Sequence, residues 1–510
     1  MLSKIKSLGL SGIDGYTVDV EVDINNGLPA YDVVGLPDAS IKEGKDRIRS
    51  AIKNSGFQYP VYKITVNLAP ADTKKEGPVY DLPIALGLLS ATDQIPVHST
   101  DEYAVLGELS LDGQLRKVKG ILPMLINARK NGFKKVIIPF ENAKEASFIE
   151  GIETYAVKSL TESVDFLLGR LPVLPVKISN YNELKDNVVY TNDFCYIKGQ
   201  STAKRALEIA AAGGHNMLMI GPPGSGKTML AKAFPSILPN LTFEEALEVT
   251  KIHSVAGILD NKQGIVLKRP FRAPHHTTTL ITMVGGGHSS RPGEVSLAHN
   301  GVLFLDEMPE YSRNLIETLR QPLEDKIVTV ARIAQTVVYP ADFTLIASMN
   351  PCPCGYYGSK IRQCKCSMSQ IRTYLNKLSG PLMDRIDLQI EVDAVDIKDF
   401  TKDELAEPSS SIKERVTNAR KIQNKRFKDT GTHNNAGMGS AMVKKYCKLD
   451  AECEKLLLTS FEKLKLTARA HDRILKVART IADLSGSENI QKEHIIEAIN
   501  YRSLDRKYWL

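Results

Sequence analysis

Strand-like and helical patterns alternate along the first 168 residues, which predicts an α/β domain. Short runs rich in apolar and β-branched residues indicate strands at 16–22, 63–68 and 135–139. Segments with apolar residues three and four apart indicate helices at 41–55, 82–89 and 121–131. A stretch over 169–193, which begins with prolines and continues with polar residues, is predicted to be a linker.

Residues 194–392 repeat the alternation, with three apolar runs that each end in polar residues. These runs are Met217–Ile220, Gly301–Leu305 and Phe343–Met349. Short continuous apolar runs are typical of strands in a parallel sheet that is covered on both faces. Residues 393–510 are charged and have helical spacing, as in Ile474, Val477, Ala478, Ile481 and Leu484, which predicts a helical unit.

The first apolar run leads into an octapeptide of the form G-x-x-x-x-G-K-[ST], a phosphate-binding P-loop. It consists of Gly221, Pro222, Pro223, Gly224, Ser225, Gly226, Lys227 and Thr228. Glycines let the backbone wrap around phosphate oxygens, so that N–H groups and the start of the next helix face the anion. Lys227 is expected to contact the β- and γ-phosphates and Thr228 to hold Mg²⁺. The alternative is a glycine-rich turn, which the order of strand, loop and helix disfavours.

The other two runs end in residues suited to ATP hydrolysis. Asp306 is expected to bind Mg²⁺ through water, and Glu307 to polarise the attacking water. The alternative is a strand that ends in two solvated acids. Asn350 is expected to orient the same water, and its alternative is an ordinary turn before Pro351.

Composition agrees with a globular cytoplasmic protein. The chain has 510 residues, of which 43% are hydrophobic and 25% charged. No apolar run approaches the roughly 20 residues of a membrane span, and the first residues lack the apolar core of a signal peptide. The net charge is +7, and residues 401–510 hold 22 Lys and Arg against 15 Asp and Glu. This balance is compatible with a nucleic-acid partner, although a solvated basic helical surface explains it equally well.

Taken together, these motifs resemble the YifB/ComM family of magnesium-chelatase-like AAA+ ATPases over nearly the whole chain. The resemblance rests on Lys198–Gln200, Gly221–Thr228, Phe271–His276, Arg291–Ser296, Gly301–Glu307, Asn350–Gly355 and Ser379–Asp387. It implies ATP and Mg²⁺ as cofactors and a homohexameric ring in which a neighbouring subunit completes each active site. It also implies that Gly199 and Gln200 belong to the segment that lines the adenine pocket.

Two arginines are identified through the same resemblance. Arg385 lies in the segment that matches the arginine finger of magnesium chelatases and MCM helicases, where a guanidinium neutralises transition-state charge. Its alternative is a surface arginine paired with Asp384 or Asp387. Arg469 matches the sensor-2 arginine of the helical lid, and Arg473, one turn further on, is the alternative.

A hairpin is predicted between the second and third strands of the ATPase. Residues 327–340 form two β-rich arms around a short polar centre. In the MCM-like branch a hairpin at this place points into the pore of the ring, so Arg332 near its tip is expected to contact the DNA backbone. A purely structural hairpin is the alternative.

The resemblance thus implies a motor on single-stranded or branched DNA. Such a motor would unwind or branch-migrate DNA in recombination or natural transformation, with recombination proteins among its partners and no membrane. The alternative is a protein-remodelling or metal-chelatase motor without DNA specificity.

Four of the seven cysteines cluster at Cys352, Cys354, Cys364 and Cys366, in the pattern C-x-C-x9-C-x-C. Four thiolates in two close pairs can close a tetrahedral Zn²⁺ site with a structural role. A spacing of two to four residues within each pair is more usual, and unligated reduced cysteines are the alternative.

The first 168 residues resemble the proteolytic domain of Lon, an S5-like α/β fold. A Ser–Lys dyad needs a hydroxyl and an amine. The matching positions fall on Val79 and Leu122, so no peptidase activity is expected.

Overall fold

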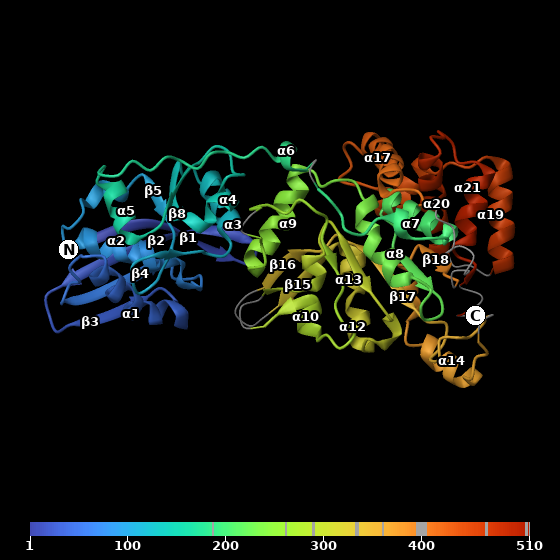
Figure 1. The fold of residues 1–510 in the computed structure, drawn as a ribbon, viewed down its shortest axis with the longest axis horizontal. Helices are drawn as coiled ribbons and strands as arrows, with labels where there is room; N and C mark the ends of the chain where they lie inside the picture. Colours follow the sequence, from blue (N-terminus) through green and yellow to red (C-terminus); the bar gives the residue numbers. More distant parts are fainter. Residues whose placement is uncertain are drawn as a thin grey trace. The chain divides into compact units, whose positions relative to one another are not determined.

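The computed structural model describes most of the chain. Described are residues 1–185, 188–260, 263–287, 291–331, 336–359, 362–393, 405–464, 468–504 and 508, without the side chains of 463, 464, 468 and 469. Internal contacts divide the chain into two compact units (Figure 1). The first comprises residues 1–187 and 242–267, and the second comprises 188–241 and 268–510.

A seven-stranded mixed sheet forms the centre of the first unit, in the order β3-β4-β2-β1-β5-β8-β9. Its strands are β1 (Leu2–Ser11), β2 (Asp14–Asn25), β3 (Ala30–Val34), β4 (Lys63–Ala69), β5 (Tyr103–Val105), β8 (Lys135–Pro139) and β9 (Glu153–Val157). A separate two-stranded pair is formed by β6 (Glu108–Leu109) and β7 (Leu115–Arg116). The helices are α1 (Ala39–Asn54), α2 (Asp81–Ala91), α3 (Ile121–Lys130), α4 (Ala143–Ala146), α5 (Leu160–Leu167), α6 (Tyr181–Lys185) and α9 (Phe243–Ala256). Every second residue of β2 from Val18 to Val22 is buried, as expected for a strand with one face on the core.

Helix α9 belongs to the first unit, although both of its neighbours in sequence belong to the second. Its N-cap is Thr242, whose side chain forms a capping box with Glu245, and its C-cap is Gly257 in the left-handed region, with φ of 75°. The predicted ATPase segment 194–392 ran through this helix without a break. The contacts instead assign residues 242–267 to the N-terminal unit.

A buried polar cluster attaches α9 to the start of α3. The Ser254 hydroxyl accepts a hydrogen bond from the Gly120 N–H at 3.0 Å and donates one to Glu145. The Glu145 carboxylate, only 3% exposed, also accepts from the Leu122 N–H at 3.1 Å. Burial raises the pKa of Glu145, and these hydrogen bonds partly offset that rise. A buried carboxylate requires such partners, so the first unit depends on α9 for its satisfied core.

A five-stranded parallel sheet forms the centre of the second unit, in the order β11-β14-β17-β10-β18. Its strands are β10 (Met217–Ile220), β11 (Phe271–Arg272), β14 (Val302–Leu305), β17 (Thr344–Met349) and β18 (Leu388–Glu391). Two hairpins accompany it: β12 (Gly285–Gly286) with β13 (Arg291–Pro292), and β15 (Ile327–Ala331) with β16 (Thr336–Pro340). Helices around the sheet are α7 (Ser201–Gly213), α8 (Lys227–Ala233), α10 (Leu280–Val284), α11 (Glu294–Leu297), α12 (Arg313–Thr318), α13 (Arg320–Asp325), α14 (Met368–Leu375) and α15 (Gly380–Met383).

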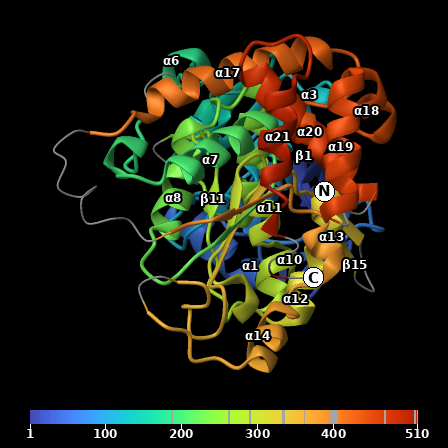
Figure 2. The same cartoon turned by 90° about the vertical axis from the view of Figure 1, so that its right-hand side faces the viewer.

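The C-terminal part of the second unit is helical. Its helices are α17 (Ser409–Arg426), α18 (Ser440–Tyr446), α19 (Ala451–Leu464), α20 (Ala468–Leu484) and α21 (Lys492–Asn500), which gather together in Figure 2. One buried apolar cluster runs from α7 and β10 into α17 and α20, so the helices share a core with the sheet. The predicted α/β class, with a parallel ATPase sheet and a helical C-terminal part, is confirmed.

The predicted strands at 63–68, 135–139 and 217–220 and the hairpin at 327–340 fall on β4, β8, β10 and β15–β16. The predicted linker contains the short helix α6 and a bridge from Pro175 to Tyr155. The centre of the hairpin, residues 332–335, lies outside the described residues.

Candidate functional site

The P-loop connects β10 to α8 at the carboxyl edge of the parallel sheet. Gly224 and Gly226 have φ of 75° and 88°, in the left-handed region that glycine adopts without strain. The Gly221 N–H donates to the Met349 carbonyl at 3.1 Å, which ties the loop to the end of β17. The loop is thus held where the strands β10 and β17 end together.

Lys227 begins α8 and turns back into the loop. Its ammonium donates to the carbonyls of Gly221 and Pro222, both at 2.8 Å. Desolvation lowers the pKa of Lys227 to about 8, although Asp306 and Glu307 favour its charged form. A phosphate group near this ammonium would favour its charged form further.

Asp306 lies at the carboxyl end of β14, beside the P-loop helix. Its carboxylate accepts from the Thr228 hydroxyl at 2.8 Å and from the buried Ser348 hydroxyl of β17. Hard oxygen ligands of this kind suit Mg²⁺, so Thr228 and Asp306 fit the cation that the P-loop chemistry requires. Ser348 was not predicted from the sequence. The only sequence signal is one hydroxyl within an apolar strand.

Glu307 follows Asp306 in a left-handed conformation, with φ of 51°. Its N–H donates to Asp306 at 3.1 Å and to Ser348 at 3.3 Å, which holds this turn in place. A non-glycine residue in this region costs conformational energy and is found disproportionately at functional sites. The structure thus holds two successive carboxylates next to the P-loop.

Asn350 directly follows β17 on the same edge. A Cβ atom added to Gly355 would lie 2.6 Å from the Pro223 ring, so the segment after Asn350 lies directly against the P-loop. The structure brings together the P-loop, both carboxylates and Asn350, because the carboxyl ends of parallel strands meet at one edge.

Gln200 reaches the P-loop from the segment before α7. Its side-chain amide donates to the Ser225 carbonyl at 3.2 Å and to the Asp393 carbonyl at 2.6 Å. Gly199 and Gln200 both have positive φ, 65° and 57°, and form the turn that starts α7. This places the predicted nucleotide-binding pair beside the P-loop.

Arg385 lies at the opposite edge of the sheet. The register pairs Met217 with Leu388 and Ile220 with Glu391, so Arg385, before β18, lies beyond the amino end of β10. The Asn216 amide donates to the Arg385 carbonyl at 3.0 Å. The P-loop leaves the other end of β10, so the length of the strand separates this guanidinium from the P-loop of its own chain.

The partners of Arg385 differ from those suggested by the sequence. Its guanidinium pairs with Glu324 and donates to the Pro381 carbonyl at 2.6 Å. Asp387 pairs instead with Arg473 of α20, and its second oxygen lies 3.1 Å from His215 Nδ1. Burial alone would raise the pKa of Asp387, but Arg473 and His215 hold that pKa well below its usual range.

Neither the side chain predicted for sensor 2 nor the residue predicted for DNA contact is among the described parts of the chain. Arg473, the alternative for sensor 2, lies at the same amino edge as Arg385 through its pair with Asp387. The side chain of Arg469 and the whole of Arg332 lie outside the described residues. The arms of the hairpin that carries Arg332 pair in register from Ile327 with Pro340 to Ala331 with Thr336.

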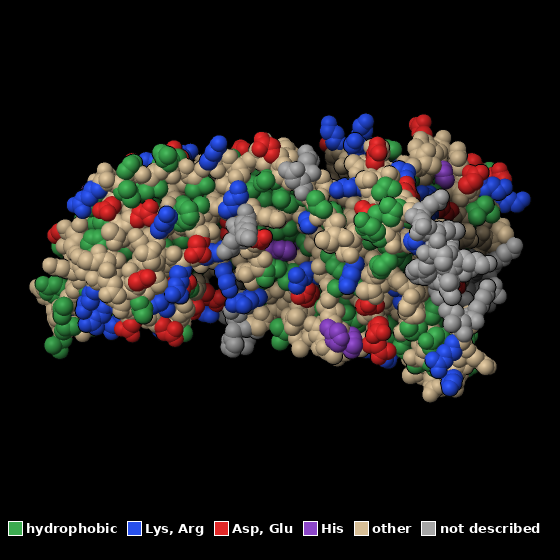
Figure 3. All heavy atoms as spheres, in the orientation of Figure 1, with side chains coloured by type: hydrophobic (Ala, Val, Ile, Leu, Met, Phe, Trp, Pro, Cys, Tyr) green, Lys and Arg blue, Asp and Glu red, His purple; other side chains and the backbone are tan. Residues whose placement is uncertain are grey.

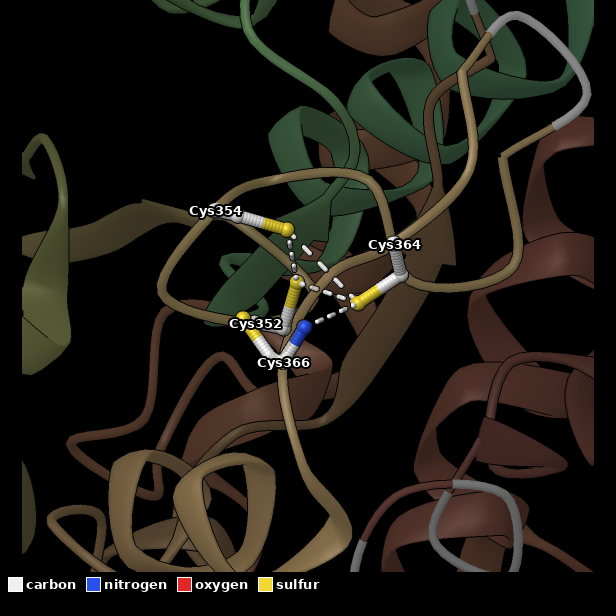
Figure 4. Close-up of side chains that lie close together, drawn as sticks. All are labelled: Cys352, Cys354, Cys364 and Cys366. Atoms are coloured by element: carbon white, nitrogen blue, oxygen red, sulfur yellow. Dashed lines mark hydrogen bonds between the residues drawn. The ribbon is translucent and has the colours of Figure 1, made fainter.

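The four clustered cysteines converge on one point (Figure 4). Cys352 Sγ lies 3.4 Å from Cys354 Sγ, and Cys364 Sγ lies 3.6 Å from both. All four sulfurs, including that of Cys366, lie within 4.8 Å of one another. Four thiolates around Zn²⁺ at about 2.3 Å define a tetrahedron with edges of about 3.8 Å. The geometry fits a metal ion with four thiolate ligands.

The sulfurs do not titrate alike. Backbone N–H groups of Lys365 and Tyr356 lower the pKa of Cys354 to about 6. The Cys366 N–H favours the Cys364 thiolate, but desolvation and the nearby sulfurs of Cys354 and Cys352 raise the pKa of Cys364 to about 12. A divalent cation between the sulfurs would remove this repulsion.

The two positions that match the Lon dyad are apolar and buried. Val79 is 3% exposed and Leu122 is fully buried, and both belong to the core of the first unit. Neither side chain offers a nucleophile or a base.

Among the described residues, none of the helices has the length and apolar character that a membrane span requires.

Three family models match the chain in succession. The model described as "Magnesium chelatase, subunit ChlI" matches residues 193–400, and "Magnesium chelatase, subunit ChlI C-terminal" matches 406–502. The model described as "Subunit ChlI of Mg-chelatase" matches residues 20–142. The matches thus cover parts of both units.

Two relatives match this chain over nearly its whole length and with the same identity. The chain is 43% identical to YifB of Escherichia coli (strain K12), over 99% of this chain and 98% of that protein. It is also 43% identical to competence protein ComM of Haemophilus influenzae, again over 99% and 98%. Lon protease 2 of Bacillus subtilis (strain 168) is 33% identical over 132 residues, which are 26% of this chain and 23% of that protein.

Proposed function

Since the chain belongs to the YifB/ComM family of magnesium-chelatase-like AAA+ ATPases, we propose that it is a ring-forming, ATP-driven DNA motor of the cytoplasm. The family implies ATP hydrolysis with Mg²⁺. DNA as the track, a hexameric ring and helicase or branch-migration activity are the parts that we add. The relative from Haemophilus influenzae carries the name competence protein, which favours a role in recombination or natural transformation.

In this mechanism the residues at the carboxyl edge bind and cleave ATP. Lys227 and the P-loop N–H groups hold the phosphates, and Thr228 and Asp306 hold Mg²⁺, which supplies charge neutralisation on the phosphates. Glu307 accepts the proton of the attacking water, and Asn350 orients that water. Ser348 holds Asp306 in position and accepts the Glu307 N–H.

The observation that supports a ring of subunits is the placement of Arg385 on the edge opposite the P-loop. A guanidinium there can meet a γ-phosphate only if a second subunit presents its own carboxyl edge to it. Arg473 lies on the same edge as Arg385 and is the described candidate for the sensor-2 role. Both arginines then act on the nucleotide of a neighbour.

DNA contact is assigned to loops rather than to a broad basic surface. Figure 3 shows one face of the protein, on which Lys and Arg side chains are interspersed with Asp and Glu side chains. We therefore do not expect a continuous positively charged surface to attract DNA on this face. One hairpin per subunit, carrying Arg332, places a ring of positive charge in a pore, and contacts to phosphates need no sequence readout.

The test is steady-state ATP hydrolysis by the full-length protein, with single-stranded DNA, forked DNA and no DNA. We expect forked or single-stranded DNA to stimulate hydrolysis, and the stimulation to disappear at high salt because phosphate contacts release counterions. Arg332→Ala should reduce the stimulation and leave basal hydrolysis unchanged. Hydrolysis that is indifferent to every DNA would reject the DNA motor and favour a protein-remodelling or chelatase-type partner.

We also propose that the four clustered cysteines hold one structural Zn²⁺. The sulfur geometry supports this, as does the close approach of Gly355, which lies between the two cysteine pairs, to Pro223 of the P-loop. The metal would fix the segment that begins at Asn350.

The protein purified without chelator should contain about one Zn²⁺ per chain. Cys364→Ser should lose most of the metal and have a lower melting temperature. Cys195→Ser, outside the cluster, should keep the zinc content and the melting temperature of the wild-type protein. Metal analysis and thermal unfolding provide the two readouts. A metal-free wild-type protein, or a Cys364→Ser variant with full zinc content, would contradict the assignment.

A further inference from the structure

Arg385 is held by an ion pair that leaves part of its guanidinium unused. Its side chain is 14% exposed, whereas that of its partner Glu324 is 65% exposed. The Arg385 Nε–H is buried and has no hydrogen-bond partner among the residues that the structure describes. An arginine has five donors in a fixed fork that matches phosphate oxygens, and a buried unused donor is costly. The pair with Glu324 is therefore a resting arrangement that a phosphate group could replace.

The surroundings of this pair are an open, polar cavity of about 430 Å³ within the second unit. Its charged lining includes Arg385, Arg473, Lys476, Glu324, Asp384 and Asp387. The Arg473 and Asp387 side chains pair with each other. The carboxylate of Glu324 faces solvent, where water and salt weaken an ion pair. A phosphate group that carries more than one negative charge would compete well for the guanidinium.

Glu324 is also connected directly to the hairpin. It lies in α13, two residues before Lys326, which ends that helix with φ of 58° and precedes β15. The Lys326 carbonyl accepts from the Ala341 N–H at 2.7 Å, and its ammonium pairs with Asp342 at 2.8 Å. Lys326 thus joins both ends of the hairpin to the end of α13. A shift of Glu324 would move the base of the hairpin.

We propose that Glu324 is a positioning residue that restrains Arg385 and couples its release to the 327–340 hairpin. When the γ-phosphate of the neighbouring subunit captures Arg385, Glu324 is released and the end of α13 is free to move. In the reverse direction, DNA that displaces the hairpin pulls Glu324 away and frees Arg385 for hydrolysis. This inference rests on the proposed trans role of Arg385 and names the residue through which DNA would regulate it.

The test is Glu324→Gln in the full-length protein, which removes the charge and keeps the shape. Basal ATP hydrolysis should rise about two- to fivefold, the range that loss of an exposed ion pair permits. The plateau with forked DNA should stay the same, so the stimulation ratio falls. The change should appear in kcat with KM for ATP unaltered, and Glu324→Asp should restore most of the restraint. Asp325→Asn, the same charge change one residue along, is the matched control and should behave as wild type.

The outcomes separate this inference from the proposed function. If Arg385→Ala hydrolyses ATP normally, the trans role fails and this inference fails with it. If Arg385→Ala is inactive but Glu324→Gln equals wild type, only the role of Glu324 is rejected. A Glu324→Gln protein with raised basal hydrolysis and an unchanged stimulation ratio would show restraint of Arg385 without coupling to the hairpin, and would overturn the coupling.

Discussion

Glu307→Gln should reduce steady-state ATP hydrolysis by about 100-fold or more, while ATP binding persists. The amide keeps the size of the side chain but cannot accept a proton from water. The left-handed turn at Glu307 is held by backbone hydrogen bonds, which the substitution leaves in place. Hydrolysis is measured by phosphate release, and binding by equilibrium titration with a fluorescent ATP analogue.

Glu310→Gln is the matched control, because Glu310 lies three residues further along and pairs with Lys377 at 3.6 Å. It should hydrolyse ATP at the wild-type rate. Retention of more than a tenth of wild-type hydrolysis in Glu307→Gln would assign the general base to another residue. Loss of nucleotide binding in that variant would instead indicate that the substitution disturbs the P-loop.

Arg385→Ala should reduce hydrolysis by about 1,000-fold, the scale at which an arginine finger acts, with ATP affinity changed much less. Arg385→Lys should recover little activity, since an ammonium lacks the planar fork that binds phosphate oxygens. Arg320→Ala is the control, because Arg320 forms a local pair with Glu317 at 3.1 Å and belongs to the same region. Phosphate release is again the measurement.

Mixing two inactive variants decides whether Arg385 acts on its own nucleotide or on that of a neighbour. Glu307→Gln subunits keep Arg385, and Arg385→Ala subunits keep a complete carboxyl edge. A mixture should regain hydrolysis wherever an Arg385→Ala site faces the arginine of a Glu307→Gln neighbour. Inhibition of wild-type protein by added Glu307→Gln shows that subunits exchange. With exchange shown, no recovery in the mixture would place Arg385 in its own site.

The carboxyl edge was the most predictable part of the site. The P-loop, the pair Asp306–Glu307 and Asn350 each directly follow a short apolar strand, and in a parallel sheet such positions meet. The P-loop, Asp306 and Asn350 could therefore be placed from local pattern alone. Ser348 was missed because one hydroxyl inside a buried strand looks like an ordinary core substitution.

The other edge could not be predicted in the same way. Arg385 and Glu324 are separated by 61 positions, and nothing in either segment identifies the other as its partner. The acids next to Arg385 in sequence were the obvious partners, yet Asp387 pairs with a helix of the lid instead. Ion-pair partners depend on tertiary geometry, which local spacing does not encode.

Long-range packing also explains what was missed in the fold. Strand β1 was not predicted, because its buried positions include Ser3 and Ser7, which weaken the apolar alternation. Ser7 is satisfied by a hydrogen bond to the Val105 carbonyl at 2.8 Å, 98 residues away. Helix α9 has clear caps, but its sequence does not indicate which sheet it packs on.

The position of α9 makes the N-terminal unit a discontinuous domain. Its chain is interrupted by residues 188–241 of the ATPase, so no single cut yields the whole unit. A fragment that ends near residue 187 would leave Glu145 and the start of α3 without Ser254. The Lon-like unit is thus not a detachable module. If the chain arose by end-to-end fusion of two genes, a helix encoded within the second gene must have come to pack in the domain encoded by the first.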